Sequence, residues 1–244
     1  GDAAALVEEL NRQVGPERMS GVQEHGTFGT VALQLDGIPL DLATARQEYY
    51  PAPGENPVVR AGTLHADLAR RDFTVNAMAL DLVAGELIDL HHGSEDLAAG
   101  QLRFLHARSV QDDPTRVIRA ARYAARLGFE LAQESSEQIR STIDKWPWTW
   151  SQSDGALAAP PALATRLRME LERLLEREPW PKALDLLEQW QALPLLDSQL
   201  QKDPRRMQRL CWARRLGLPL MPSLLLGAAE PVAVAQRLQI PGKQ

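Results

Sequence analysis

Asp113 and Arg116 stand one helical turn apart in the segment Asp112-Asp113-Pro114-Thr115-Arg116, and this pair of side chains could read a nucleobase. A carboxylate accepts hydrogen bonds and a guanidinium donates them. Cytosine and adenine each present an amino donor beside a ring-nitrogen acceptor, whereas uracil and guanine present the reverse pattern. An Asp–Arg pair could therefore accept C and A and reject U and G without a nucleic-acid template, provided that a nucleotide is held nearby.

A second segment, residues 70–79, could surround a triphosphate and its sugar. It reads Arg-Arg-Asp-Phe-Thr-Val-Asn-Ala-Met-Ala and leads into a predicted strand. Arginine suits phosphate oxygens, Asn76 offers both a donor and an acceptor, and Asp72 could orient an arginine. The alternative is a helix N-terminus with Asp72 as its cap.

Asp41 is a third candidate, because it lies in the middle of a predicted strand. In that strand the apolar side chains of residues 38, 40 and 42 share one face, so Asp41 points to the other. From the residues alone, Asp41 is either an exposed polar position or a metal ligand.

The helix predicted over residues 113–128 is bounded by Pro114 in its first turn and by Gly128 just after its end. At 100° per residue, one face is a basic stripe and the opposite face is made of small apolar residues. The stripe could be a solvated surface, but no glutamate is interleaved with its four arginines, which are Arg116, Arg119, Arg122 and Arg126.

Helices and strands must position these candidate residues, and the periodicity of apolar residues indicates which segments form strands and which form helices. We predict a helix over 2–14, strands over 27–36 and 38–44 joined at Asp36-Gly37, an irregular and mobile loop over 49–57, and a hairpin over 77–90. From about residue 94 the pattern is helical. The further helices are predicted over 94–100, 134–144, 161–177, 180–192 and 204–216. Residues 146–161 are predicted to form a loop whose three tryptophans either stack on bases or fill a groove between helices. The fold class is α+β, with strands first and an all-helical part after them.

Composition restricts the classes of function. The chain has 244 residues, 44% of them hydrophobic and 24% charged, which is typical of a globular protein. No apolar run reaches the roughly 20 residues of a membrane helix, and the single cysteine excludes an intrachain disulfide framework, so the expected compartment is the cytoplasm. The net charge of −5 argues against a general nucleic-acid coat protein. Two basic islands, at 101–126 and 201–215, nevertheless suggest local contacts with phosphates, and 23 of the 27 basic residues are arginine.

A metal-hydrolysis site at His91-His92 with Asp89 and Asp96 is not favoured, because the spacing fits no zinc pattern.

In this order, the motifs resemble those of the class II tRNA nucleotidyltransferase and poly(A) polymerase family, whose tRNA members add CCA. Residues 40–48, Leu-Asp-Leu-Ala-Thr-Ala-Arg-Gln-Glu, look like the family's strand with its third catalytic carboxylate. Residues 70–77 match the signature RRDFTxNA, and residues 89–103 resemble the hinge between head and neck. Residues 112–116 resemble the amino-acid template motif, with Asp112 where glutamate is usual.

The resemblance implies a polymerase-β-like nucleotidyltransferase head with a mixed sheet, followed by a helical neck and body. The domains would be residues 1–105 (head, without its first hairpin), 106–180 (neck, nucleotide-reading and RNA-binding) and 181–244 (incomplete body). In the family, two Mg²⁺ ions activate the 3′-hydroxyl of tRNA and stabilise the triphosphate of CTP or ATP.

Residue by residue, the resemblance assigns Asp41 as a catalytic carboxylate and Mg²⁺ ligand. Arg71, Asp72 and Asn76 would bind the nucleotide, Asp113 and Arg116 would read its base, and Arg119 and Arg122 would line its pocket. The tRNA would lie along the helical part and contact Arg205, Arg206 and Arg209. The loop over 49–57 corresponds to a segment implicated in switching from C to A.

The chain departs from the family in one respect: the Gly-Gly phosphate loop and the Asp-x-Asp metal pair precede the region that matches. Asp41 is then a metal ligand whose fellow ligands are absent from this chain, and we expect the chain as given to be an inactive or nearly inactive fragment. Addition of CCA, of CC or of A remain alternatives. A bacterial poly(A) polymerase, or a noncatalytic nucleotide- or RNA-binding module, is also possible on these motifs, and the oligomeric state is not predicted.

Overall fold

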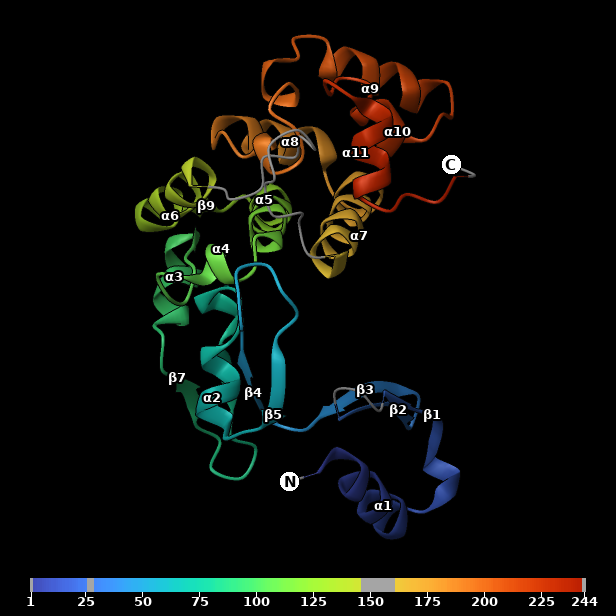
Figure 1. Cartoon of the computed structure of the whole chain (residues 1–244). Helices are drawn as coiled ribbons and strands as arrows, with labels where there is room; N and C mark the ends of the chain where they lie inside the picture. Colours follow the sequence, from blue (N-terminus) through green and yellow to red (C-terminus); the bar gives the residue numbers. More distant parts are fainter. Residues whose placement is uncertain (1, 26–28, 146–160, 243–244) are drawn as a thin grey trace. The chain divides into compact units, whose positions relative to one another are not determined.

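The computed structural model describes the chain except residues 1, 26–28, 146–160 and 243–244 (Figure 1). The predicted tryptophan loop therefore lies outside the described residues. The chain divides into two compact units, which are described separately. Unit 1 comprises residues 1–49 and 57–70, and unit 2 comprises residues 50–56 and 71–244. One of the three boundaries between the units falls between the adjacent arginines Arg70 and Arg71.

Unit 1 contains a small sheet covered by a helix, and then a two-stranded ribbon with a second helix. Its elements are α1 (Ala3–Val14), a 3₁₀ turn (Pro16–Arg18), β1 (Met19–His25), β2 (Thr30–Leu35), β3 (Ile38–Ala43), β4 (Arg46–Tyr49), β5 (Val58–Ala61) and α2 (Leu64–Ala69). Strands β1, β2 and β3 form an antiparallel sheet in that order, and β4 pairs antiparallel with β5.

The first sheet is held by a small core between α1 and β2, where Ala3, Val7, Val31 and Leu33 are buried. Asp2 caps α1 by accepting a hydrogen bond from the backbone N–H of Ala4. At the predicted Asp36-Gly37 turn both residues have positive φ, 51° and 79°, as a tight two-residue hairpin requires.

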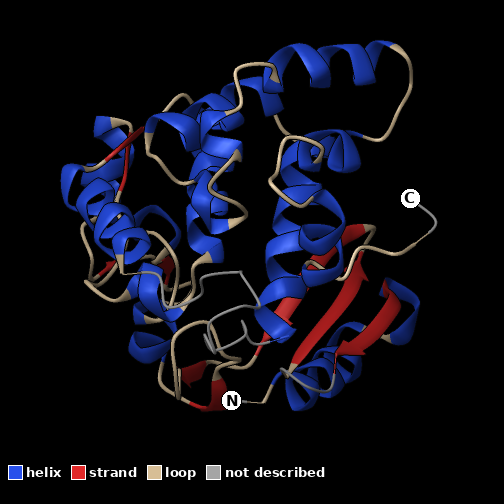
Figure 2. Ribbon diagram, turned by 45° about the horizontal axis from the view of Figure 1, so that its top comes forward, coloured by secondary structure: helices blue, strands red, loops and turns tan. Residues whose placement is uncertain are grey.

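Helices predominate over strands in the described residues (Figure 2), and most of these helices belong to unit 2. Unit 2 contains a 3₁₀ turn (Thr74–Asn76), β6 (Met78–Leu80), β7 (Leu87–Asp89), α3 (Gly93–Ala99), β8 (Gln101–Leu102), α4 (Ser109–Asp112), α5 (Thr115–Leu127), β9 (Glu130–Leu131) and α6 (Gln133–Asp144). There follow α7 (Pro161–Arg177), α8 (Trp180–Gln189), 3₁₀ turns at Leu193–Leu195 and Leu200–Lys202, α9 (Arg206–Arg215), α10 (Leu220–Leu225) and α11 (Pro231–Arg237).

One continuous hydrophobic core runs through unit 2 from Phe73 to Leu238. The alanine-rich face of α5 packs into it, and α5 contacts both α7 and α8. As predicted, Gly128 ends α5 in the left-handed conformation. Within the described ranges, no helix has both the length and the apolar character needed to cross a membrane.

The α+β class predicted from the sequence is confirmed. The described strands form four separate small sheets, of which only the β8–β9 pair is parallel. The interpretation of residues 70–79 as a helix N-terminus capped by Asp72 is wrong. The segment forms a three-residue 3₁₀ turn with Phe73 at its N-cap, because the backbone N–H of Thr74 donates a hydrogen bond to the carbonyl of Arg103.

Candidate functional site

Asp72 joins the 70–79 segment to helix α5. Its side chain is buried, and its Oδ1 accepts hydrogen bonds from the backbone N–H of Phe73 and from Nδ2 of Asn76, each at 2.9 Å. Its Oδ2 accepts from Nε of Arg119 at 2.8 Å and from Nη2 at 2.5 Å. The structure thus brings together Asp72, Asn76 and Arg119, three of the residues singled out from the sequence, and Asp72 does orient an arginine.

The position of Asp72 is fixed by the residues that follow it. Phe73 is fully buried and stacks on Phe104 with ring centroids 5.4 Å apart. Thr74 donates from its backbone N–H to the carbonyl of Arg103 at 3.0 Å and from its hydroxyl to Asp96 at 2.7 Å. A Cβ on Gly93 would overlap the carbonyl oxygen of Thr74, so only glycine fits this approach. Arg71 is exposed at the start of the segment.

Asp113 and Arg116 lie at the start of α5, as predicted. Oδ1 of Asp113 accepts hydrogen bonds from the backbone N–H of Thr115 at 3.2 Å and from its hydroxyl at 2.7 Å. Nη2 of Arg166, on α7, lies 3.9 Å from the same oxygen. Asp113 therefore ties down the first turn of α5 and keeps its carboxylate beside a cation, while Arg116 is buried with 5% of its surface exposed.

Residues 50–56 contact the same region through backbone atoms. The N–H of Gly54 donates to the carbonyl of Asp112 at 3.1 Å. Nη2 of Arg166 donates to the carbonyl oxygens of Gly54 at 2.7 Å and Glu55 at 3.2 Å. The predicted irregular loop is thus anchored beside the start of α5, with Gly54 buried at a φ of 71°.

The basic stripe of α5 is matched by carboxylates from residues that sequence reasoning missed. Glu170 on α7 pairs with Arg119 and Arg122, and Glu178 pairs with Arg122 and Arg126. Both glutamates are buried, and Glu178 has only 1% of its side chain exposed. Three of the four arginines of the stripe therefore take part in an ion-pair network with buried carboxylates, although Arg126 keeps 48% of its side chain exposed.

This network shifts the ionisation of its members. Burial lowers the pKa of Arg119, but the charge of Asp72 and its hydrogen bonds outweigh that effect, so the net shift of the pKa is upward. For Glu178, burial raises the pKa, whereas the hydrogen bonds and charges of Arg126 and Arg122 lower it more, giving a net lowering. Both groups are therefore held in their charged forms.

Asp41 lies in unit 1, on β3, opposite Ala32 of β2. As the alternation predicted, Asp41 is exposed, while Leu40 and Leu42 lie partly buried on the other face. Within the described ranges its side chain makes no hydrogen bond or ion pair, and no group of three or more histidine, cysteine, aspartate or glutamate residues could hold a metal ion. A divalent cation needs several oxygen ligands, so one exposed carboxylate does not make a metal site by itself.

Arg70, the first arginine of the signature, makes its contacts within unit 1. Its Nη1 lies 2.9 Å from Oε1 of Glu48, and its Nη2 lies 2.7 Å from Oδ1 of Asp67. The two adjacent arginines of the motif thus have different surroundings, because Arg70 ties α2 to the β4–β5 ribbon.

The three arginines expected to contact RNA, Arg205, Arg206 and Arg209, differ in their exposure to solvent. Arg206 has 2% of its surface exposed and donates to the carbonyl of Leu200 and to Glu188. Arg209 bridges Asp203 and the carbonyl of Ser223. Of the three, only Arg205 is exposed, because Arg206 and Arg209 hold together the turns around α9 and α10.

Near His91 and His92, the two carboxylates Asp89 and Asp96 make hydrogen bonds to neighbouring residues. Asp89 accepts hydrogen bonds from the backbone N–H groups of Gly93 and Ser94 and from the Ser94 hydroxyl. Asp96 binds Thr74 and Arg103. Both carboxylates therefore act in the local structure around α3.

Comparison with known proteins shows which family and which individual proteins the chain resembles. Residues 2–103 match the family described as the Poly A polymerase head domain. The A-adding tRNA nucleotidyltransferase of Aquifex aeolicus is 33% identical over 219 residues, which are 88% of this chain and 25% of that protein. The CC-adding tRNA nucleotidyltransferase of Deinococcus radiodurans is 44% identical over 151 residues, 59% of this chain and 40% of that protein. The chain thus spans only a quarter to two fifths of these relatives.

Solved structures agree with the sequence relatives. A CCA-adding enzyme in its apo form II superposes with a TM-score of 0.78 and 26% identity, covering 100% of this chain and 58% of that chain. A tRNA nucleotidyltransferase complexed with a primer tRNA and an incoming ATP analog superposes with a TM-score of 0.65 and 25% identity, covering 99% of this chain and 70% of that chain. In its motifs, its fold and these relatives, the chain is similar to the tRNA nucleotidyltransferases and poly(A) polymerases, and residues 2–103 match the head domain of that family.

Proposed function

We propose that the chain is part of a template-independent nucleotidyltransferase that adds C, A or both to the 3′ end of tRNA. In this reaction the 3′-hydroxyl attacks the α-phosphate of CTP or ATP, a phosphodiester bond forms, and pyrophosphate leaves. The observation that carries the proposal is the link from Asp72 to Arg119, since it joins the RRDFT signature to the helix that bears Asp113 and Arg116.

The roles of the residues follow from their surroundings. Arg71 is exposed and could meet the phosphates, and Asp113 and Arg116 form the base-reading pair. Arg119 is positioned by Asp72, and Arg122 by two glutamates, so we assign Arg122 to holding the pocket wall rather than to direct phosphate contact. Asp41 would supply one oxygen ligand to a divalent cation, Mg²⁺, which supports the attacking hydroxyl and the triphosphate when bound.

Among the helical residues, the proposal keeps Arg205 as an RNA contact, because its guanidinium is at the surface. Arg206 and Arg209 support the same surface from within. The site of action is the cytoplasm, where tRNA, CTP and ATP are available.

Base-selective binding tests the proposal. Calorimetric titration of this chain with CTP, ATP, UTP and GTP in the presence of Mg²⁺ is expected to show binding of CTP and ATP only. Because a bidentate base contact is worth about 1–3 kcal/mol, Asp113→Ala is expected to weaken CTP and ATP binding about tenfold or more. Asp185→Ala, which removes an exposed carboxylate on α8, is the matched control and is expected to bind like the wild type.

Other outcomes would contradict or redirect the proposal. Equal binding of all four nucleotides would show that Asp113 and Arg116 do not read the base. Binding of none would show that these residues do not form a nucleotide site. Binding of ATP alone would favour a poly(A) polymerase, or an A-adding enzyme, over an enzyme that adds C.

A further inference from the structure

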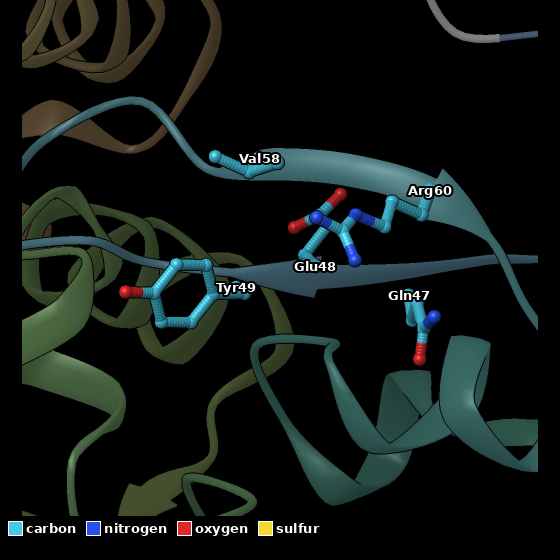
Figure 3. Close-up of a pocket in the computed structure, with 5 residues that line it drawn as sticks. All are labelled: Gln47, Glu48, Tyr49, Val58 and Arg60. Carbon is cyan, nitrogen blue, oxygen red and sulfur yellow. The ribbon is translucent and has the colours of Figure 1, made fainter.

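The β4–β5 ribbon of unit 1 carries a cavity of about 350 Å³. It is lined by Gln47, Glu48, Tyr49, Val58 and Arg60, whose side chains are shown in Figure 3. Its volume lies at the low end of the roughly 300 to 1,000 Å³ found for small-molecule sites. The cavity therefore has room for one nucleotide-sized group rather than for an extended ligand.

The strand register sets which side chains face outward together. Gln47 lies directly opposite Arg60, and Tyr49 lies opposite Val58. Since alternate residues of a strand point to opposite faces, these four side chains share one face of the ribbon. All four are exposed, whereas Glu48 and its partner Val59 are less so. The ribbon thus presents an amide, a cation, an aromatic ring and an aliphatic side chain on its open face.

Of the two charged side chains that line this cavity, one is paired within the protein and the other is not. The carboxylate of Glu48 is occupied, because Arg46 lies 3.0 Å and Arg70 lies 2.9 Å from its Oε1. The guanidinium of Arg60 makes no ion pair or hydrogen bond with any residue that the structure describes. The cavity therefore offers one guanidinium to an external anion, and a planar guanidinium is well suited to phosphate oxygens.

An aromatic ring stands beside that cation. Tyr49 has 64% of its surface exposed and Val58 has 42%, so apolar surface that could bury a flat ring faces solvent. Proteins that bind single-stranded nucleic acid combine such a ring, on which a base stacks, with a cation for the backbone. We propose that this cavity binds one nucleotide of single-stranded RNA, with the base on the Tyr49 ring and the phosphate on Arg60. The proposal rests on the proposed function, since it assigns the cavity to the RNA acceptor.

RNA binding by variants of the whole chain tests this assignment. The probe is a short fluorescein-labelled oligocytidylate followed by fluorescence anisotropy. Tyr49→Leu removes the stacking surface and is expected to weaken binding about tenfold, whereas Tyr49→Phe keeps the ring and is expected to stay within about twofold. Arg60→Gln is expected to weaken binding about fivefold and to lower the slope of log K against log salt by about 0.7.

Matched controls separate the cavity from general electrostatics. Arg140→Gln removes an exposed arginine on α6 and is expected to leave the affinity unchanged. Because Tyr49 and Arg60 are exposed, all variants are expected to unfold at the wild-type temperature, which circular dichroism checks. An equal loss for Arg140→Gln and Arg60→Gln would overturn the proposal, as would wild-type affinity in Tyr49→Leu.

A second ligand distinguishes RNA from a free nucleotide, which carries the same base and phosphate. Unlabelled CMP, titrated as a competitor, is expected to bind at least tenfold more weakly than the oligonucleotide. Equal affinity would assign the cavity to a free nucleotide and overturn the RNA proposal.

The proposed function and this inference can fail separately. Asp113-dependent binding of CTP together with RNA binding that ignores Tyr49 and Arg60 would retain the function and remove the cavity. RNA binding that depends on Tyr49 and Arg60, without base-selective nucleotide binding, would do the reverse.

Discussion

The sheet that carries Asp41 and the helix pair α5–α7 differ in how their charged side chains are placed: the first leaves a carboxylate exposed and unpaired, and the second buries carboxylates in ion pairs. Asp41 is exposed on β3, the core of its sheet consists of four buried residues on α1 and β2, and no described side chain pairs with it. In the helix pair, the buried Glu170 on α7 and Glu178, the residue that follows α7, hold Arg119, Arg122 and Arg126 beside a large apolar core. The helix pair fixes its arginines before any ligand arrives, whereas Asp41 takes its function from whatever binds to it.

The largest effect is expected from breaking the helix pair. Glu178→Ala leaves Arg122 buried with half of its carboxylate partners, and loss of one member of a buried ion pair costs about 3–5 kcal/mol. Glu134→Ala is the matched control, because Glu134 also pairs with an arginine, Arg103, but is 74% exposed. An exposed pair is worth only about 0–1 kcal/mol. Urea denaturation of the two variants checks the contrast, and equal losses would show that burial does not distinguish the two pairs.

A smaller effect is expected from acid. The pKa of Glu178 is lowered in the folded chain, while an unfolded glutamate titrates near pH 4.3. Its contribution to stability is therefore present above that pH and is lost as the pH falls through the lower, folded pKa. In urea denaturation from pH 7 downward, the stability difference between wild type and Glu178→Gln is expected to shrink. A difference that grows toward low pH would reverse the sign of the assigned shift.

The smallest effect on stability is expected at Asp41. Because its side chain is exposed and has no described partner, Asp41→Asn is expected to change the free energy of unfolding by less than about 0.5 kcal/mol. Glu24→Gln, which changes an exposed carboxylate on β1, is the matched control and is expected to have an equally small effect, and urea denaturation checks both variants. A large loss of stability in Asp41→Asn would place Asp41 with the structural carboxylates.

Local signals in the sequence predicted the elements that have clear ends. Pro114 and Gly128 bounded α5, the Asp36-Gly37 pair marked the hairpin, and the four-residue spacing of apolar residues 6, 10 and 14 indicated α1. The ribbon β4–β5 was missed, because its strands are only four residues long and neither Arg-Gln-Glu-Tyr nor Val-Val-Arg-Ala shows the apolar–polar alternation that indicates a strand. Strand β1 was missed for a similar reason, since its sequence Met-Ser-Gly-Val-Gln-Glu-His has little apolar periodicity.

The candidate site was predicted where its partners are close in sequence, and less well where they are not. Asp72 and Asn76 belong to one motif, but Glu170 and Glu178 lie about fifty residues beyond the arginines they hold. Their positions in a leucine-rich helical segment gave no sign of a partner. Arg206 could have been recognised, because Arg206, Leu210 and Ala213 recur at helical spacing and all three are buried.

The anchoring of residues 50–56 has a consequence for how this segment can evolve. The hydrogen bonds that hold it beside α5 involve the backbone N–H and carbonyl of Gly54 and the carbonyl of Glu55. Mutations that change the side chains of Ala52 or Glu55 therefore leave these bonds intact, whereas a change at Gly54, with its positive φ, does not. Selection on this segment therefore acts on its backbone conformation, so residue types there can change while the backbone conformation is conserved.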